Sequence, residues 1–126
     1  EEVKFGTQIE QQTIAPCVNL IGQTTLTQLA AILKQAKLVI SPDTGPLHLA
    51  NAVATPVIGL YAVTRPEYIG PYLKIQSCLS VYPQAAEKYM HKTPEQLTWQ
   101  KKIPSLEAMQ LISVEQVLNK VQTLTL

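Results

Sequence analysis

The chain has 126 residues, of which 46% are hydrophobic and 15% are charged, and its formal net charge is +1. This length predicts a single domain, and the composition is typical of a folded protein rather than a disordered one. The charge balance favours neither nucleic acid nor an acidic substrate as a partner. No apolar run approaches the roughly 20 residues that span a bilayer, and the polar N-terminus does not have the pattern of a signal peptide.

Residues 17–62 predict alternating strands and helices. The apolar runs 17–22, 38–41 and 57–62 are typical of buried strands. Helical spacing of apolar residues predicts a helix that begins at a capping box of Thr25 and Gln28, and a short helix is expected over 46–54. Such alternation is typical of a parallel sheet that is covered on both faces. We therefore expect an α/β fold, a Rossmann-like three-layer α/β/α arrangement with a mainly parallel sheet.

The pattern is less regular after residue 62. Residues 63–74 predict a structured loop and residues 75–82 a further strand, whereas residues 83–92 have no clear period. A helix is expected to begin at Thr93, with Pro94 in its first turn and Gln96 completing a capping box. A similar signature at Ser113 predicts the last helix, whose apolar stripe comprises Val114, Val117, Leu118 and Val121.

Several kinds of chemistry do not fit this sequence. Asp43 is the only aspartate, so a D-x-D metal site is impossible, and the two histidines and two cysteines do not form a convincing zinc site. The glycine fingerprints of dinucleotide-binding proteins and P-loops do not occur in it. We therefore expect no metal and no other cofactor. Cys17 and Cys78 are expected to be reduced and buried, which favours the cytoplasm.

The candidate site is the turn of Asp43, Thr44 and Gly45 between strand 38–41 and the next helix. Ligands of an open parallel sheet bind outside the carboxyl ends of the strands. The first amides of a helix lack internal partners and carry the positive end of its dipole, so they suit a phosphate that Gly45 lets approach closely. His48 can donate to a phosphate or a sugar hydroxyl. Asp43 is expected to shape or cap the turn, or to bind a hydroxyl, rather than to touch phosphate.

The same residues also have simpler interpretations. The segment S-P-D-T-G-P makes a good turn and helix cap without any ligand. A lone histidine such as His48 is more often a satisfied core residue, and a lone arginine such as Arg65 is more often a solvated loop cation. The pattern alone leaves these alternatives open.

The stretch LVISPDTGPLHLANAVATPVIGLYAVTRPEYIGPY (38–72) resembles the C-terminal domain of the ADP-heptose–lipopolysaccharide heptosyltransferase family of glycosyltransferases. That family has a strand, D-T-G-x-x-H, a small-residue helix, T-P, a second strand, and a loop with T-x-P and G-P-Y. In this chain the T-x-P motif begins at Thr64, and G-P-Y occupies residues 70–72. Residues 19–36 and the segment SVEQVL also look like the family.

The resemblance implies a GT-B architecture, in which two Rossmann-like domains enclose a cleft and the C-terminal one binds the nucleotide-sugar donor. It implies that residues 1–126 are a single donor-binding domain and that the N-terminal acceptor domain, with the catalytic base, is absent from this chain. No catalytic residue and no metal ligand is then expected here. By the same resemblance the donor-binding residues are Asp43, Thr44, Gly45 and His48, and further candidates are Thr64, Arg65 and, at the ribose, Glu1 or Glu2.

The expected function is donor binding in a heptosyltransferase-like enzyme that moves a sugar from ADP-heptose, or another nucleotide sugar, to a lipopolysaccharide core-type acceptor. This chain alone is expected to be inactive, and the full enzyme to be cytoplasmic and associated peripherally with the membrane. Residues 62–66 read A-V-T-R-P where the family often has G-P-T-D-P, which leaves the sugar open. Two alternatives remain: a non-catalytic Rossmann-like interaction domain, or part of a sugar-nucleotide epimerase.

Overall fold

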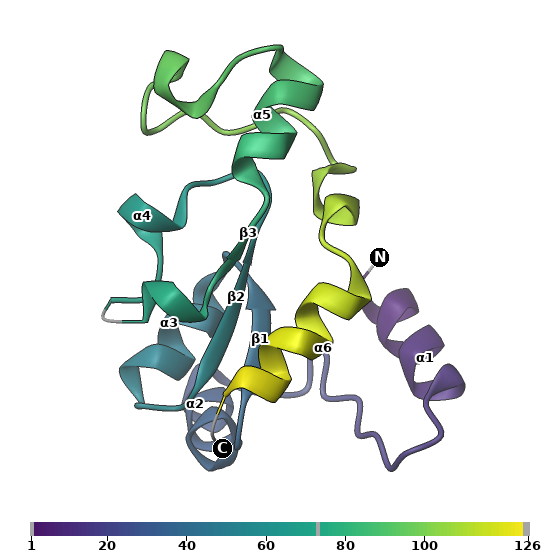
Figure 1. The fold of residues 1–126 in the computed structure, drawn as a ribbon. Helices are drawn as coiled ribbons and strands as arrows, with labels where there is room; N and C mark the ends of the chain where they lie inside the picture. Colours follow the sequence, from purple (N-terminus) through teal and green to yellow (C-terminus); the bar gives the residue numbers. More distant parts are fainter. Residues whose placement is uncertain (1, 73, 125–126) are drawn as a thin grey trace.

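The computed structural model describes residues 2–72 and 74–124 (Figure 1). One parallel sheet has the strand order β1-β2-β3. The strands are β1 (Val39–Pro42), β2 (Val57–Tyr61) and β3 (Leu79–Ser80). β1 pairs with β2 along its whole length, whereas β3 pairs only with the last two residues of β2. The carboxyl ends of β1 and β2 therefore lie side by side, which is the geometry that the candidate site requires.

Helices cover the sheet from two sides. α2 (Leu26–Gln35) and α3 (Gly45–Ala52) pack against each other on one side, and α6 (Val114–Thr123) lies on the other (Figure 1). The core between the sheet and the first pair comprises Leu33, Leu47, Ala50, Val57 and Tyr61. This arrangement confirms the expected α/β, Rossmann-like fold with a parallel sheet.

Helix caps form where the sequence predicts them. Thr25 accepts from the Gln28 amide and begins α2, and Ser113 accepts from the Gln116 amide and begins α6. The capping box of Thr93 and Gln96 also forms, but only a single 3-10 turn follows it. Leu97 then adopts extended backbone and packs against the second core cluster, so the helix expected from residue 93 does not continue.

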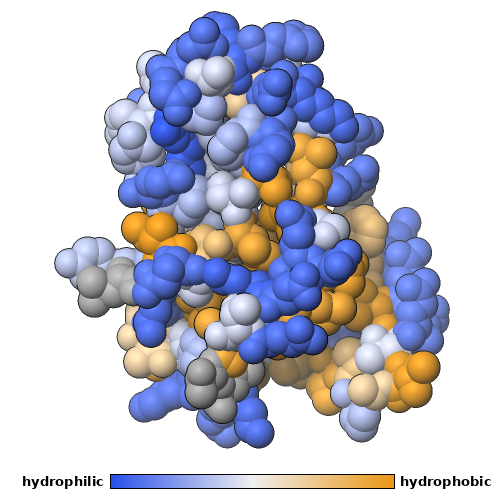
Figure 2. Space-filling model, in the orientation of Figure 1, coloured by the Kyte–Doolittle hydropathy of each residue, from blue (hydrophilic) through white to orange (hydrophobic). Residues whose placement is uncertain are grey.

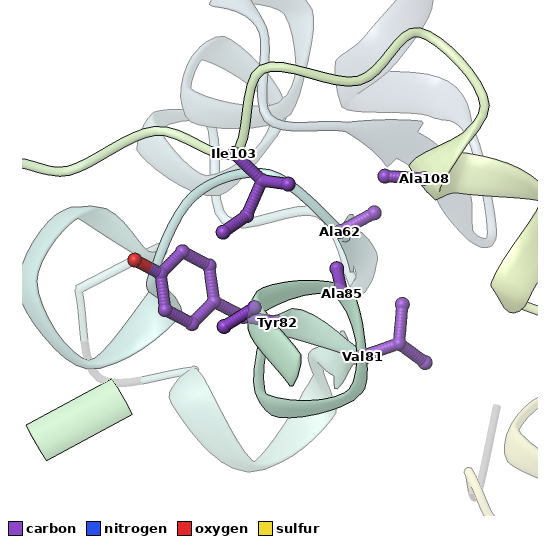
Figure 3. Close-up of a cluster of buried hydrophobic side chains, with 7 residues drawn as sticks. Ala62, Val81, Tyr82, Ala85, Ile103 and Ala108 are labelled. Carbon is purple, nitrogen blue, oxygen red and sulfur yellow. The ribbon is translucent and has the colours of Figure 1, made fainter. Parts of the chain in front are cut away.

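A second core cluster joins the end of β2 to the later part of the chain. It comprises Ala62, Val81, Tyr82, Ala85, Ala86, Ile103 and Ala108 (Figure 3). The shorter elements that follow β2 are α4 (Pro66–Ile69), η1 (Ile75–Ser77), α5 (Tyr82–Met90), η2 (Pro94–Gln96) and η3 (Ala108–Leu111), and the cluster draws residues from α5 and η3. The strand expected over 75–82 is therefore mostly a 3-10 turn with two strand residues, and α5 occupies a segment without a clear sequence period. No helix in the described part of the chain is long and apolar enough to cross a membrane.

The buried strand expected over 17–22 does not form. These residues are irregular, and Val18 is 77% exposed. A strand needs a neighbour for its backbone hydrogen bonds, and no strand of the described residues lies beside this segment. Cys17 is consequently exposed, contrary to expectation, while Cys78 is half-buried. Both are free thiols, and burial raises the pKa of Cys78 to about 11.

The second face of the sheet is only partly covered. β1 is an edge strand, and its Ile40 side chain is 46% exposed. Hydrophobic residues also lie exposed between α6 and α1 (Glu2–Gln12), where Figure 2 shows orange surface. Within the expected stripe of α6, Val117 and Val121 are half-buried, but Val114 and Leu118 are exposed. Helices therefore cover this face of the sheet less completely than the face beneath α2 and α3.

Candidate functional site

The turn between β1 and α3 is held by a threonine that does not cap the helix. Thr44 is the N-cap residue of α3, but its side chain makes no capping hydrogen bond. Its Oγ1 atom lies 3.0 Å from Ser41 Oγ and 3.3 Å from the Pro42 carbonyl oxygen. The Thr44 side chain therefore holds the turn through Ser41 and Pro42, and it leaves the first amides of α3 without a side-chain acceptor.

The first amides of α3 face open space. Thr44 and Gly45 are exposed, and their amides donate to no atom of residues 2–72 or 74–124. Pro46 has no N–H, and the Leu47 amide donates to the Thr44 carbonyl at 3.1 Å. A Cβ atom built on Gly45 would meet nothing within 4 Å. Two free amides at the positive end of a helix dipole are suited to binding an anion.

Asp43 lies beside these amides and is held by two side chains. Its Oδ2 atom accepts from Thr64 Oγ1 at 2.9 Å, and its Oδ1 atom lies 3.2 Å from His48 Nε2. Thr64 is buried and follows β2, so this bond ties together the ends of two neighbouring strands. The Asp43 side chain is 19% exposed and that of His48 is 45% exposed. Asp43 thus does not cap α3, but it joins the turn, His48 and Thr64 into one cluster.

Glu2 lies on the same face as the start of α3. It belongs to the first turn of α1 and lines a groove of about 440 Å³ that also reaches Pro46. The other lining residues are Leu20, Ile21, Gly22, Thr24, Leu29 and Ile32. Because Pro46 follows Gly45, this mostly apolar groove adjoins the free amides. Glu1 lies outside the described residues.

Two small cavities lie beside Thr64. The first has a volume of about 150 Å³ and is lined by Asp43, Thr64 and Lys102, among others. The second has a volume of about 180 Å³, shares Thr64 and Lys102 with the first, and contains Arg65. The structure thus brings Thr64 to the turn but directs Arg65 to the neighbouring cavity. Within the described ranges, no three His, Cys, Asp or Glu side chains group as ligands of a metal ion.

Comparison with known proteins assigns the chain to a family. The sequence profile of glycosyltransferase family 9 (heptosyltransferase) matches residues 1–99. The chain belongs to this family. The matched range contains the whole cluster of Asp43, His48 and Thr64 and the free amides of α3.

Several relatives share this heptosyltransferase family region. Lipopolysaccharide core heptosyltransferase OpsX of Haemophilus influenzae is 40% identical over 86% of this chain and 31% of its own length. Lipopolysaccharide heptosyltransferase 1 of Salmonella typhimurium is 42% identical over 50% of this chain and 20% of its own length. Lipopolysaccharide heptosyltransferase 2 of Escherichia coli is 33% identical over 56% of this chain and 20% of its own length. The chain thus spans about a third or less of these relatives. No solved structure matches it.

Tyr61 is a neighbour of Asp43 that the sequence did not reveal. It ends β2 and is fully buried, and its hydroxyl lies near the Asp43 carboxylate without forming a hydrogen bond of ordinary geometry to any described residue. Burial strongly raises the pKa of Tyr61, and the nearby Asp43 carboxylate raises it further. The hydroxyl therefore stays protonated as a buried donor beneath the site. A tyrosine in an apolar strand has no sequence signal that separates it from a packing residue.

Replacing Tyr61 with phenylalanine is expected to leave the free energy of unfolding unchanged or to raise it by up to about 1 kcal/mol, because a buried donor without a partner costs stability. Urea unfolding of the two chains measures this difference. A loss of more than about 1 kcal/mol would show that the hydroxyl makes a hydrogen bond in solution.

Proposed function

We propose that this chain is the donor-binding domain of a heptosyltransferase-like glycosyltransferase and that the start of α3 binds the diphosphate of a nucleotide sugar. The observation that supports this most is the pair of Thr44 and Gly45 amides, which face open space without an acceptor among the described residues. The names of the relatives support a lipopolysaccharide core-type acceptor and heptose as the sugar. The parent enzyme would transfer that sugar with inversion, using a base from outside this chain.

The proposed chemistry needs a group that stabilises a departing diphosphate. Negative charge grows on this leaving group as its bond to the sugar breaks, and amides already fixed at a helix N-terminus stabilise it without reorganisation. No metal ion is needed in this scheme. Asp43 has the same sign of charge as the diphosphate, so its proposed partner is a sugar hydroxyl. His48, which lies 3.2 Å from Asp43, can donate to the donor from the next turn of α3.

The nucleoside of the donor is proposed to bind in the groove beside Pro46. Its apolar lining from residues 20–32 suits a base, as in most small-molecule sites. The Glu2 carboxylate can accept hydrogen bonds from the ribose hydroxyls. The groove adjoins Gly45, so the base, ribose and diphosphate of one ligand could lie along it in order. The free thiols of Cys17 and Cys78 agree with a proposed cytoplasmic location.

Calorimetric titration of the chain with ADP, UDP and GDP tests this proposal. We expect saturable binding of one diphosphate, and affinity for the matching monophosphate that is lower by about tenfold, because the β-phosphate contributes charged hydrogen bonds to the amides. Binding by none of the three diphosphates, or equal affinity for the monophosphate, would contradict it. The first of these results would favour a non-catalytic interaction domain.

A further inference from the structure

We propose that the cavity of about 180 Å³ beside the donor site binds an acidic or phosphorylated sugar of the acceptor, an inference that rests on the proposed function. We call this cavity the Arg65 pocket. Three of its lining residues are cationic and none is acidic. The lining residues that carry the argument are Thr64, Arg65, Ile69, Trp99, Lys101 and Lys102.

The Arg65 guanidinium is fixed in place without a carboxylate partner. Its carbon Cζ lies 5.0 Å from the ring centroid of Tyr68 and 5.6 Å from that of Tyr82, and Nη1 donates to the Pro94 carbonyl at 3.2 Å. The side chain is half-buried and forms no ion pair within the described residues. Glu95 lies near it, but the pKa of Glu95 is lowered mainly by its hydrogen bond with Thr93 and only in small part by Arg65.

The half-buried Arg65 guanidinium, which has no carboxylate partner, can bind an anionic ligand. One of the five guanidinium N–H donors is used by the protein, and the planar fork of the others matches a carboxylate or phosphate. Lys101 and Lys102 line the same cavity and add positive charge. Charge-assisted hydrogen bonds of this kind are stronger than hydrogen bonds between neutral groups.

The other wall of the pocket fits a sugar ring. Trp99 packs against Tyr68 with ring centroids 5.7 Å apart and lines the cavity together with Ile69. The C–H face of a sugar packs on an aromatic ring, while an acidic substituent reaches the cations. The volume admits a single monosaccharide rather than a chain of them. The combination of aromatic wall and cations therefore favours a charged sugar over free phosphate.

The position of the Arg65 pocket assigns that sugar to the acceptor. The pocket shares Thr64 and Lys102 with the smaller cavity that contains Asp43. The groove with Glu2 and Pro46, where we place the nucleoside, has no lining residue in common with it.

Trp99 is the only tryptophan of the chain, so its fluorescence reports on the pocket directly. The chain is titrated with mannose 6-phosphate, glucuronate, mannose and inorganic phosphate. We expect a saturable response to the two charged sugars, and affinities for mannose and for inorganic phosphate that are weaker by about tenfold. Arg65→Gln and Lys102→Gln should each weaken charged-sugar binding about tenfold. Lys37→Gln, an exposed site at the opposite end of β1, should not.

Other outcomes would overturn the inference. They are equal binding of mannose, equal binding of inorganic phosphate, or unchanged affinity in Lys102→Gln, which tests the pocket even if Arg65→Gln fails to fold. Displacement of mannose 6-phosphate by the tightest nucleoside diphosphate would assign the pocket to the donor and also overturn it. A chain that binds no diphosphate, but keeps its Arg65-dependent response to charged sugars, would contradict only the proposed donor function.

Discussion

Replacing Gly45 with valine is expected to lower the affinity for the nucleoside diphosphate by about 100-fold, or about 2.8 kcal/mol. The added side chain would extend into the open space beside Gly45, close to the free amides where we place the diphosphate. The fold should tolerate it, because a Cβ atom at this position meets nothing within 4 Å. The free energy of unfolding should therefore change by less than about 0.5 kcal/mol.

The matched control adds the same side chain at the other end of the same helix. Ala52 is exposed in the last turn of α3, so Ala52→Val should leave diphosphate affinity unchanged. Titration calorimetry gives both affinities, and urea unfolding checks both folds. Retained affinity in a folded Gly45→Val chain would mean that the diphosphate does not bind at these amides.

Replacing Asp43 with alanine is expected to lower the free energy of unfolding by about 2 kcal/mol. The buried Thr64 hydroxyl would lose its acceptor, and His48 would lose its partner. The link between the ends of β1 and β2 would be lost with them, so diphosphate affinity should also fall. Urea unfolding measures the first effect and calorimetry the second.

Replacing Asp43 with asparagine separates the contribution of its hydrogen bonds to stability from the contribution of its charge. Asp43→Asn keeps an oxygen that can accept from Thr64, so it should restore about half of the lost stability. Glu67→Ala, which removes an exposed carboxylate from α4, is the control and should change stability by less than about 0.5 kcal/mol. Full stability in Asp43→Ala would show that the cluster does not hold the two strand ends together.

The predictions that succeeded depend on neighbouring residues. The segment from β1 through α3 to β2 has two apolar runs, a turn and a helix within about 23 residues, and its signals are all local. The caps at Thr25 and Ser113 are likewise set by residues three positions apart. The turn of Asp43 to Gly45 could therefore be placed at the end of a strand from the sequence alone.

The features that could not be predicted depend on distant partners. Residues 17–22 have the composition of a strand but no described neighbour with which to pair. α5 is held by Ala85 and Ala86 against Ala62 and Ile103, and small residues of this kind produce no clear period. The bond from Asp43 to Thr64 and the shared lining of Arg65 and Lys102 join residues that are far apart in the sequence. Only the folded chain brings these together.

The uncovered strand β1 has a practical consequence for work with this chain. β1 pairs with β2 on one edge, and on its other edge the backbone N–H and C=O groups pair with no described strand. The exposed Ile40 side chain adds apolar surface to this strand. Such a border is a template onto which a strand of another molecule can add. We therefore expect oligomers to grow with concentration when the chain is purified alone, and a lysine in place of Ile40 to keep it monodisperse.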